Sequence, residues 1–464
     1  MFKLRITGRH HAALKSHLFP GDGKEAVALV LCGRRNGAGT HVLMTWRISP
    51  VPYNDCRVRT PSQVTWNTDL LEPLLVEASK KGLAILKIHS HPSGFANFSS
   101  TDDVADKELF SSIYSWLDDG LPHMSAVMLP DGRILARVVG RDGKMRPVDL
   151  ISVVGDDLQF WHQAQDGTAP ANEYDNKNKQ FFGEKTYESL RRLKAAVLGC
   201  SGTGSPMTEQ LARLGIGELI LVDPDVVKEK NLNRILNTTR KDALEEIPKV
   251  FALSRAIDAM ELGTVVIPLA SNLIDGAILR QLAECDVIFG CMDSAEGRYY
   301  LNRLAVFYSI PYFDLGVRLD ADGKGGVSYA CGSVHYLQPD GSSLIGRGMI
   351  SMDDVAAEGL ARRDPAEYER RKHEGYIRNV HVERPAVITI NMLIAAMAGN
   401  EFIARIHKFR RVDGADSAIR IFDLRENDHI GQAEGAPCTI LAQYAGRGDM
   451  DLFLDDPAPE LQTK

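Results

Sequence analysis

The chain has 464 residues, of which 44% are hydrophobic and 25% charged, and its formal net charge is −7. That length exceeds one ordinary domain, and the composition is that of a globular protein. The mild charge predicts no nucleic-acid partner, and no apolar run approaches the ~20 residues of a membrane span. The first residues lack a signal-peptide core, and the cysteines form no Cys-x-x-Cys pair. We therefore expect a cytoplasmic protein without disulfides or a structural zinc knuckle.

Residues 1–155 are predicted to form an α+β domain. Strand patterns lie at 26–32, 41–47, 84–89, 124–129 and 133–139, and helical patterns at 67–81 and 102–118. Asp131-Gly132 is typical of a tight hairpin and is expected to join the last two strands.

The sequence His89-Ser90-His91-Pro92 closes the strand at 84–89. Because side chains alternate along a strand, both histidines are expected on one face. The run Ser99-Ser100-Thr101 is a good N-cap for the next helix, which carries Asp103. Together with Glu25 upstream, these residue types can build a hydrolytic zinc site, which needs three protein ligands and an open position for water.

This spacing resembles the JAB/MPN (Mov34/PAD-1-like) metalloprotease family: His-x-His-Pro, seven residues, Ser, two residues, Asp. The resemblance implies that His89, His91 and Asp103 bind Zn²⁺. It further implies that Ser100 hydrogen-bonds the bound water or the tetrahedral intermediate, and that Glu25 is the general base. From the residues alone, Ser100 to Asp103 could instead be only a helix cap, with acidic residues favoured by the helix dipole.

A polar stretch from Gln163 to Lys179 marks a linker, and we assign 156–190 to the linker and a leading helix. From Leu193 the pattern alternates between strand and helix, which predicts a parallel, doubly wound, Rossmann-like α/β domain over 191–425. Residues 426–464 are expected to be a C-terminal tail.

The buried strand at 195–198 runs into Gly199-Cys200-Ser201-Gly202-Thr203-Gly204-Ser205 and then a helix. Such glycines let backbone N–H groups approach phosphates at a helix N-terminus. The next strand, 218–222, ends in Asp223, a position typical of ribose binding. No Gly-Lys-Ser/Thr follows, so this is no Walker-type loop, and by itself the loop fits NAD, FAD or ATP.

A longer series of residues favours ATP over the other two cofactors. It comprises Asp223-x-Asp225, Asn231-Leu232-Asn233-Arg234, Lys249 and Cys291-Met292-Asp293. Over roughly 180–410 it resembles the E1-like ThiF/MoeB/HesA adenylation family. The resemblance implies that ATP is held by Gly199, Gly202, Gly204, Asp223 and Asp225, that Asn231, Arg234 and Lys249 contact its phosphates, and that Asp293 supports Mg²⁺. Attack of a carboxylate on the α-phosphate indeed needs cations that neutralise developing charge.

The sequence departs from that family in three places. Where members carry an arginine finger, this chain offers only Lys177 or Lys179. Paired Cys-x-x-Cys motifs are absent, and no cysteine lies between Cys331 and Cys438. Cys438 lies in the expected tail, where exposure would suit a nucleophile that takes a carrier from its adenylate. An ordinary tail cysteine is the alternative.

The whole chain resembles prokaryotic fusions of a JAB/MPN metalloprotease with an E1-like adenylation domain. The resemblance implies a bifunctional enzyme: a zinc (iso)peptidase acting on a ubiquitin-like protein, and an ATP-dependent adenylyltransferase acting on that protein's terminal glycine. Sulfur-carrier activation for biosynthesis, a carrier-binding module with a degenerate E1 site, and a nicotinamide-dependent oxidoreductase are the alternatives. We expect a ubiquitin-like or sulfur-carrier partner, an E2-like transfer enzyme in the conjugation case, and a homodimer.

Overall fold

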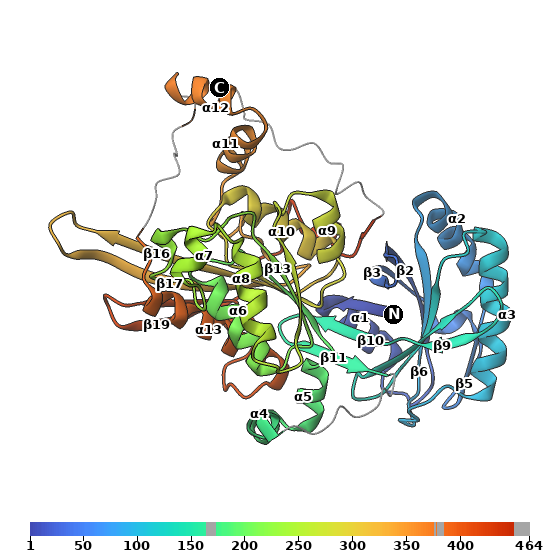
Figure 1. The fold of residues 1–464 in the computed structure, drawn as a ribbon. Coiled ribbons are helices and arrows are strands. Elements are labelled where there is room, and N and C mark those ends of the chain that lie inside the picture. The colour runs from blue at the N-terminus through green and yellow to red at the C-terminus, as the bar shows by residue number, and fades with distance from the viewer. Residues whose placement is uncertain (164–172, 375–376, 378–384, 450–464) are drawn as a thin grey trace. The chain divides into compact units, whose positions relative to one another are not determined.

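The computed structural model describes residues 1–163, 173–374, 377 and 385–449. The chain divides into two compact units (Figure 1). The first takes in Met1–Pro170, Phe307–Ser309 and Tyr444–Phe453, so far as these are described, and the second takes in the remainder. Within the described residues, no helix combines the length and the apolar character that crossing a membrane requires.

The first unit is built on one mixed sheet with the strand order β11-β10-β1-β3-β2-β6-β7-β8-β9. Its strands are β1 (Phe2–Thr7), β2 (Val27–Asn36), β3 (His41–Pro50), β6 (Ala84–Ser90), β7 (His123–Met128), β8 (Ile134–Val139), β9 (Met145–Pro147), β10 (Leu150–Val154) and β11 (Leu158–His162), beside a separate ribbon of β4 (Cys56–Thr60) and β5 (Gln63–Trp66). Its helices are α1 (Gly8–Leu18), α2 (Glu72–Lys81) and α3 (Ser100–Leu117).

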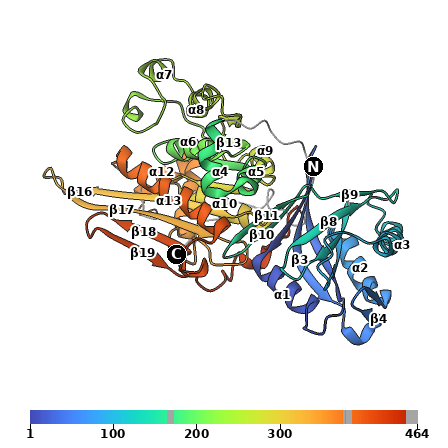
Figure 2. The ribbon, with the colours of Figure 1, turned by 90° about the horizontal axis from the view of Figure 1, so that it is seen from below.

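Apolar side chains cover both faces of this sheet. On one face, Leu14 and Leu18 of α1 join a buried cluster with Leu4 and Val30. On the other face, a second cluster joins α2 and α3 to the sheet, with Phe110 of α3 fully buried. Figure 2 shows α1 on one side of the strands and α2 and α3 on the other. The predicted α+β class is confirmed, and α3 is fixed against β6, the strand that carries His89 and ends just before His91.

His123 is a buried histidine of this core. Its Nδ1 accepts a hydrogen bond from the Ile85 N–H at 2.9 Å, which leaves the proton of the neutral ring on Nε2, 3.6 Å from the Asp119 carboxylate. Burial lowers the pKa of His123 to about 4. Protonation of Nδ1 would also break the bond to Ile85, so the fold favours the neutral ring.

We expect this histidine to make stability depend on pH. The pKa of the unfolded ring is near 6.5 and that of the folded ring about 4, so the unfolded chain binds the proton first as pH falls. The contribution of His123 to the free energy of unfolding is fully present above pH 6.5 and is lost by about pH 4. The loss amounts to about 3 kcal/mol. Denaturant unfolding of wild type and His123→Gln at several pH values checks this. The advantage of wild type should shrink as pH falls, and a constant difference would contradict it.

The second unit holds an eight-stranded sheet with the order β14-β13-β12-β15-β16-β17-β18-β19. Its strands are β12 (Lys194–Leu198), β13 (Glu218–Val222), β14 (Val265–Leu269), β15 (Val287–Gly290), β16 (Tyr312–Ala321), β17 (Val327–Leu337), β18 (Ile419–Asp423) and β19 (Asp428–Gln432). Its helices are α4 (Asn176–Phe182), α5 (Glu184–Leu190), α6 (Gly204–Leu214), α7 (Arg240–Leu244), α8 (Lys249–Asp258), α9 (Gly276–Leu282), α10 (Ala295–Phe307), α11 (Met352–Arg363), α12 (Pro365–His373) and α13 (Ile388–His407).

Five strands, from β14 to β16, are parallel, and the following three pair antiparallel. The chain leaves β12 toward β13 and β14 on one side, and returns to β15 and β16 on the other. In open α/β sheets, ligands bind at the carboxyl ends of strands where the order reverses in this way. The predicted doubly wound α/β class is confirmed, and the Gly-rich loop leaves β12 at this position.

The structure differs from the expected domain limits at two places. β11 pairs with β10, so the sheet of the first unit continues past residue 155. β19 pairs with β18, so part of the expected tail at 426–464 is a strand of the second unit. Backbone pairing holds both segments in their sheets, although turn-forming residues such as Gly431 and Gly435 predict irregular structure around β19.

Candidate metal centre and nucleotide site

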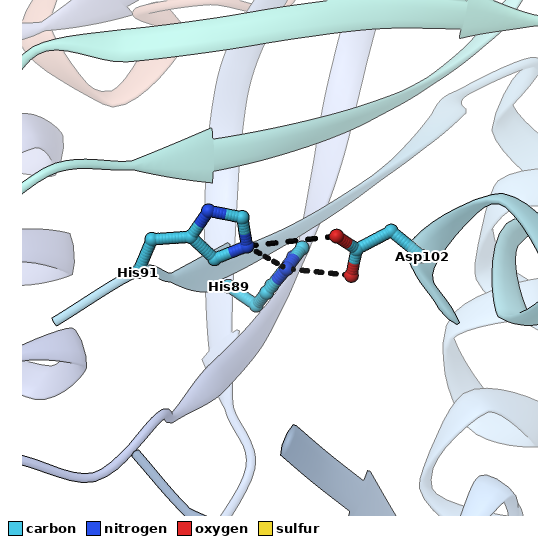
Figure 3. Close-up of side chains that lie close together, drawn as sticks. All are labelled: His89, His91 and Asp102. Atoms are coloured by element: carbon cyan, nitrogen blue, oxygen red, sulfur yellow. Dashed lines mark hydrogen bonds and ion pairs between the residues drawn. The ribbon is translucent and has the colours of Figure 1, made fainter. Parts of the chain in front are cut away.

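Two histidines and one aspartate converge at the end of β6 (Figure 3). His89 and His91 project from the same face, and their Nε2 atoms lie 3.2 Å apart. The third member is Asp102 in the first turn of α3, whose Oδ1 lies 2.9 Å from His89 Nε2. One donor atom from each of the three residues lies within 4.8 Å of the others.

The expected third ligand, Asp103, is therefore corrected to Asp102. Ser99 is the N-cap of α3 and forms a capping box with Asp102, whose Oδ2 accepts from the Ser99 N–H and hydroxyl, each at 2.7 Å. These bonds turn the Asp102 carboxylate back over the helix start, toward β6. Asp103 is one residue further around the helix, is half exposed, and pairs with Arg137 of β8.

The same shift of one residue applies to the serine. Ser100 is predicted to hydrogen-bond the zinc-bound water or the tetrahedral intermediate. In the structure it is the first residue of α3 and is exposed. Ser99, which the sequence reasoning missed, lies beside Asp102 through the capping box. The signal was in the sequence, because Ser99-x-x-Asp102 is itself a capping-box pattern.

The protonation states of His89 and Asp102 suit metal binding. At His91, burial is outweighed by the contacts with Asp102 and Phe95, which raise the pKa, so that metal would compete with a proton there. His91 Nδ1 lies 2.8 Å from the Phe95 carbonyl, so this nitrogen carries the proton and the Nε2 lone pair faces the cluster. Burial lowers the pKa of His89 to about 4. Burial alone would raise the pKa of Asp102, but the contacts with both histidines hold it well below its usual range. A neutral imidazole and an ionised carboxylate are the forms that ligate metal.

Glu25 lies next to this cluster, because the charges of His91 and Asp102 act on its carboxyl group. β2 and β6 are antiparallel with Val27 opposite His89, and the Ser90 N–H donates to the carbonyl of Ala26, the residue after Glu25. Burial raises the pKa of Glu25 to about 7, although the nearby His91 opposes the shift. A carboxyl group with such a pKa can accept and release a proton near neutral pH.

A buried network of ion pairs holds α3 against the sheet behind the cluster. Asp106, four residues after Asp102, is 2.9 Å from Lys87 Nζ and 2.7 Å from an Arg137 nitrogen. Lys87 precedes His89 by two residues on β6, so the network joins the strand and the helix that carry the candidate ligands. The sequence reasoning did not find it, because a charged residue within a strand pattern resembles a surface position.

In the second unit, the Gly-rich loop follows β12 as predicted. Gly199 has a φ of +86°, and a Cβ there would lie 2.6 Å from the Cys291 carbonyl oxygen. A Cβ on Gly204 would lie 1.8 Å from the Gly199 oxygen. Both positions therefore need glycine for close backbone packing. The Cys200 N–H of this loop donates to Asp223 Oδ2 at 2.8 Å.

Several predicted nucleotide residues meet at the ends of β12 and β13. Lys249 Nζ lies 2.7 Å from Asp225 and 3.3 Å from Asp223. Lys249 and Asp223 are buried, whereas the Asp225 carboxylate is mostly exposed. Burial lowers the pKa of Lys249, but the charges of the two carboxylates outweigh it and raise the pKa overall. Lys249 thus stays charged next to the loop.

The other predicted residues lie on the segments that follow β13 and β15. Arg234 is half-buried, and its Cδ lies 3.4 Å from the position of a Cβ on Gly202. Asn231 is buried and accepts from the Lys228 N–H at 3.1 Å, so it shapes the turn that precedes Arg234. Asp293 follows β15 and is exposed.

Cys438 differs from its prediction. It is buried rather than exposed, and its Sγ accepts from the Ser343 hydroxyl at 3.0 Å. The neighbouring Glu434 binds Arg347 at 3.2 Å and Ser342, which ties this segment to the loop after β17. The expectation of an accessible tail thiol was therefore wrong.

Comparison with known proteins finds a family match in each of the two units of the chain. Residues 174–429 match the ThiF family, and residues 8–131 match a family described as prokaryotic homologs of the JAB domain. The chain is 28% identical over 137 residues to a Saccharomyces cerevisiae protein named ubiquitin-activating enzyme E1-like, across 29% of this chain and 21% of that protein. It is 36% identical over 124 residues to the Bos taurus adenylyltransferase and sulfurtransferase MOCS3, across 26% and 27%.

The chain thus spans about a quarter of the length of these two relatives. Among solved structures it is similar to E. coli MccB, with 16% identity and a TM-score of 0.44, across 92% of this chain and 98% of that one. Because the match at 174–429 covers more than half of the 464 residues, this chain belongs to the ThiF family, and it carries in addition an N-terminal prokaryotic JAB domain.

Proposed function

We propose that this chain is a bifunctional enzyme of a ubiquitin-like pathway. Its first unit would be a zinc-dependent (iso)peptidase that processes or removes a ubiquitin-like protein. Its second unit would adenylate the terminal glycine of that protein with ATP and Mg²⁺. The observation that supports the first activity most is the convergence of His89, His91 and Asp102, with Glu25 beside them.

The donor set of two imidazole nitrogens and a carboxylate oxygen fits zinc, and His89, His91 and Asp102 would hold it. When bound, zinc would supply Lewis-acid polarisation of the scissile carbonyl and a water of lowered pKa. In hydrolysis, water adds to the carbonyl carbon and the C–N bond breaks. Glu25, whose pKa is about 7, would take the proton of the water and give it to the departing amine.

Adenylation is supported by membership of the ThiF family and by the group around Lys249. A carboxylate oxygen of the carrier would attack the α-phosphorus of ATP, and the bond to pyrophosphate would break. Lys249 and Arg234 would neutralise charge on the phosphates. Asp223 would bind the ribose, and the oxygens of Asp225 and Asp293 are of the type that holds Mg²⁺.

A peptidase assay and an exchange assay test the two halves separately. A carrier with residues added after its terminal glycine should be cleaved there, with loss on chelation and recovery with zinc. The mature carrier should support carrier-dependent ATP–pyrophosphate exchange, whereas the same carrier lacking its terminal glycine should not. NAD binding in place of ATP, seen by calorimetry, would contradict adenylation. No cleavage of any candidate carrier by zinc-loaded protein would contradict the peptidase.

Sulfur-carrier activation remains the second candidate, because MOCS3, one of the matched relatives, is named an adenylyltransferase and sulfurtransferase. Intact-mass spectrometry with Mg·ATP and carrier separates the outcomes. A reductant-sensitive adduct of carrier mass, lost in Cys438→Ala, would indicate a thioester and require the contact with Ser343 to open. Adenylate without an adduct would favour direct transfer to another protein, such as an E2-like enzyme, or sulfur chemistry.

A further inference from the structure

One polar side chain near the nucleotide loop has no role in the arguments above. Asn391 lies in the first turn of α13 and is 4% exposed. Its Nδ2 is buried and has no hydrogen-bond partner within the described residues. An unpaired buried amide costs about 1–3 kcal/mol, so such a group usually has a partner, and a ligand can supply one.

The amide faces the Gly-rich loop. A Cβ on Gly202 would lie 2.2 Å from Asn391 Nδ2, so the glycine leaves the room that this amide occupies. α13 packs along α6, the helix that starts at the end of the loop, and a Cβ on Gly399 of α13 would lie 3.2 Å from Gln210 Oε1 and 3.8 Å from Met207 Cε of α6.

The segment that carries Arg234 reaches the same place. Asn233 Nδ2 donates to the carbonyl of Ala386, just before α13, at 3.5 Å. The Arg234 side chain lies near the same point, since its Cδ would be 3.4 Å from a Cβ on Gly202. Two segments distant in sequence, residues 231–234 and the start of α13, therefore meet the loop at Gly202.

An amide N–H can only donate, so the missing partner of Asn391 is a hydrogen-bond acceptor. The loop leads into the N-terminal end of α6, which favours anions, so the fitting acceptor is an anionic oxygen of a phosphate. We propose that Asn391 binds ATP directly, by donating a hydrogen bond from Nδ2 to an oxygen of the triphosphate. This inference rests on the proposed nucleotide site and adds a contact from α13.

The test compares binding of Mg·ATP and of adenosine by isothermal titration calorimetry, with the full-length chain. Asn391→Ala should weaken ATP binding about tenfold or more, because a hydrogen bond to a charged group is lost. Asn391→Asp should weaken it further, since it places a negative charge against the phosphates. Adenosine binding should change less than about twofold in both, because adenosine has no phosphate. The matched control is Asn400→Ala, an exposed asparagine on the same helix, which should behave as wild type.

Each other outcome has a distinct meaning. If wild type does not bind ATP, the proposed nucleotide site fails. If wild type binds ATP and both Asn391 variants bind it equally well, only the role of Asn391 is wrong. Equal weakening of ATP and adenosine, or failure of both variants to fold, would show that the amide supports the fold and would also overturn the proposal.

Discussion

Replacing Asp102 with asparagine is expected to abolish zinc binding and peptidase activity, whereas Asp103→Asn should leave both nearly unchanged. The two residues are neighbours, but only the Asp102 carboxylate faces the histidines, at 2.9 Å from His89. Asparagine can still accept the capping bonds of Ser99, so the helix start should survive. What is lost is an anionic ligand, and affinity should fall by more than about 100-fold, beyond the ~10–100-fold effect of changes around a ligand.

The measurement is zinc content after dialysis against a zinc buffer, together with cleavage of the extended carrier. Asp103→Asn is the matched control, because it removes only the pairing with Arg137 on a half-exposed carboxylate. Loss of zinc in Asp103→Asn with retention in Asp102→Asn would restore the register predicted from the sequence and reject the one seen in the structure.

The second large effect is expected at Lys249. Lys249→Met keeps the apolar stem and removes the charge, so carrier-dependent pyrophosphate exchange should fall by about 100- to 1,000-fold, the range for removal of one transition-state charge contact. The loss also leaves the buried Asp223 without its counter-charge, which should cost about 3 kcal/mol of stability. Activity is therefore measured below the unfolding temperature of the variant.

Lys241→Met serves as the control for a lost surface charge, because Lys241 on α7 is 78% exposed. It should keep full exchange activity. Exchange in Lys249→Met within about threefold of wild type, with the variant folded, would remove Lys249 from the proposed phosphate contacts.

The sequence predicts the two fold classes and most of the residues of the two candidate sites. It can do so because motifs at strand ends are recognisable without knowledge of the tertiary structure. It does not settle the register of the metal site. Two serines, Ser99 and Ser100, are adjacent, and so are two aspartates, Asp102 and Asp103. The Ser-x-x-Asp spacing after His91 is therefore met twice, once from Ser99 and once from Ser100. Only the choice of helix N-cap, which depends on the path of the chain, decides between them.

Other elements were missed for related reasons. β1 contains Lys3 and Arg5, which resemble surface residues but are buried at 3% and 2% exposure. β19 forms a strand because it pairs with β18, and amino-acid composition does not indicate such pairing. Asn391 lies in an otherwise apolar helix pattern, and only the approach of Gly202 distinguishes it from a core asparagine.

The capping box of α3 has one further consequence. Asp102 is oriented by its bonds to Ser99, and these bonds belong to the folded helix whether or not a metal is present. The entropy of ordering this ligand is therefore lost during folding and not during metal uptake. In this respect the site is unlike a zinc finger, whose chain folds only on its ion. Metal exchange in such a preorganised centre would leave the fold of the first unit in place.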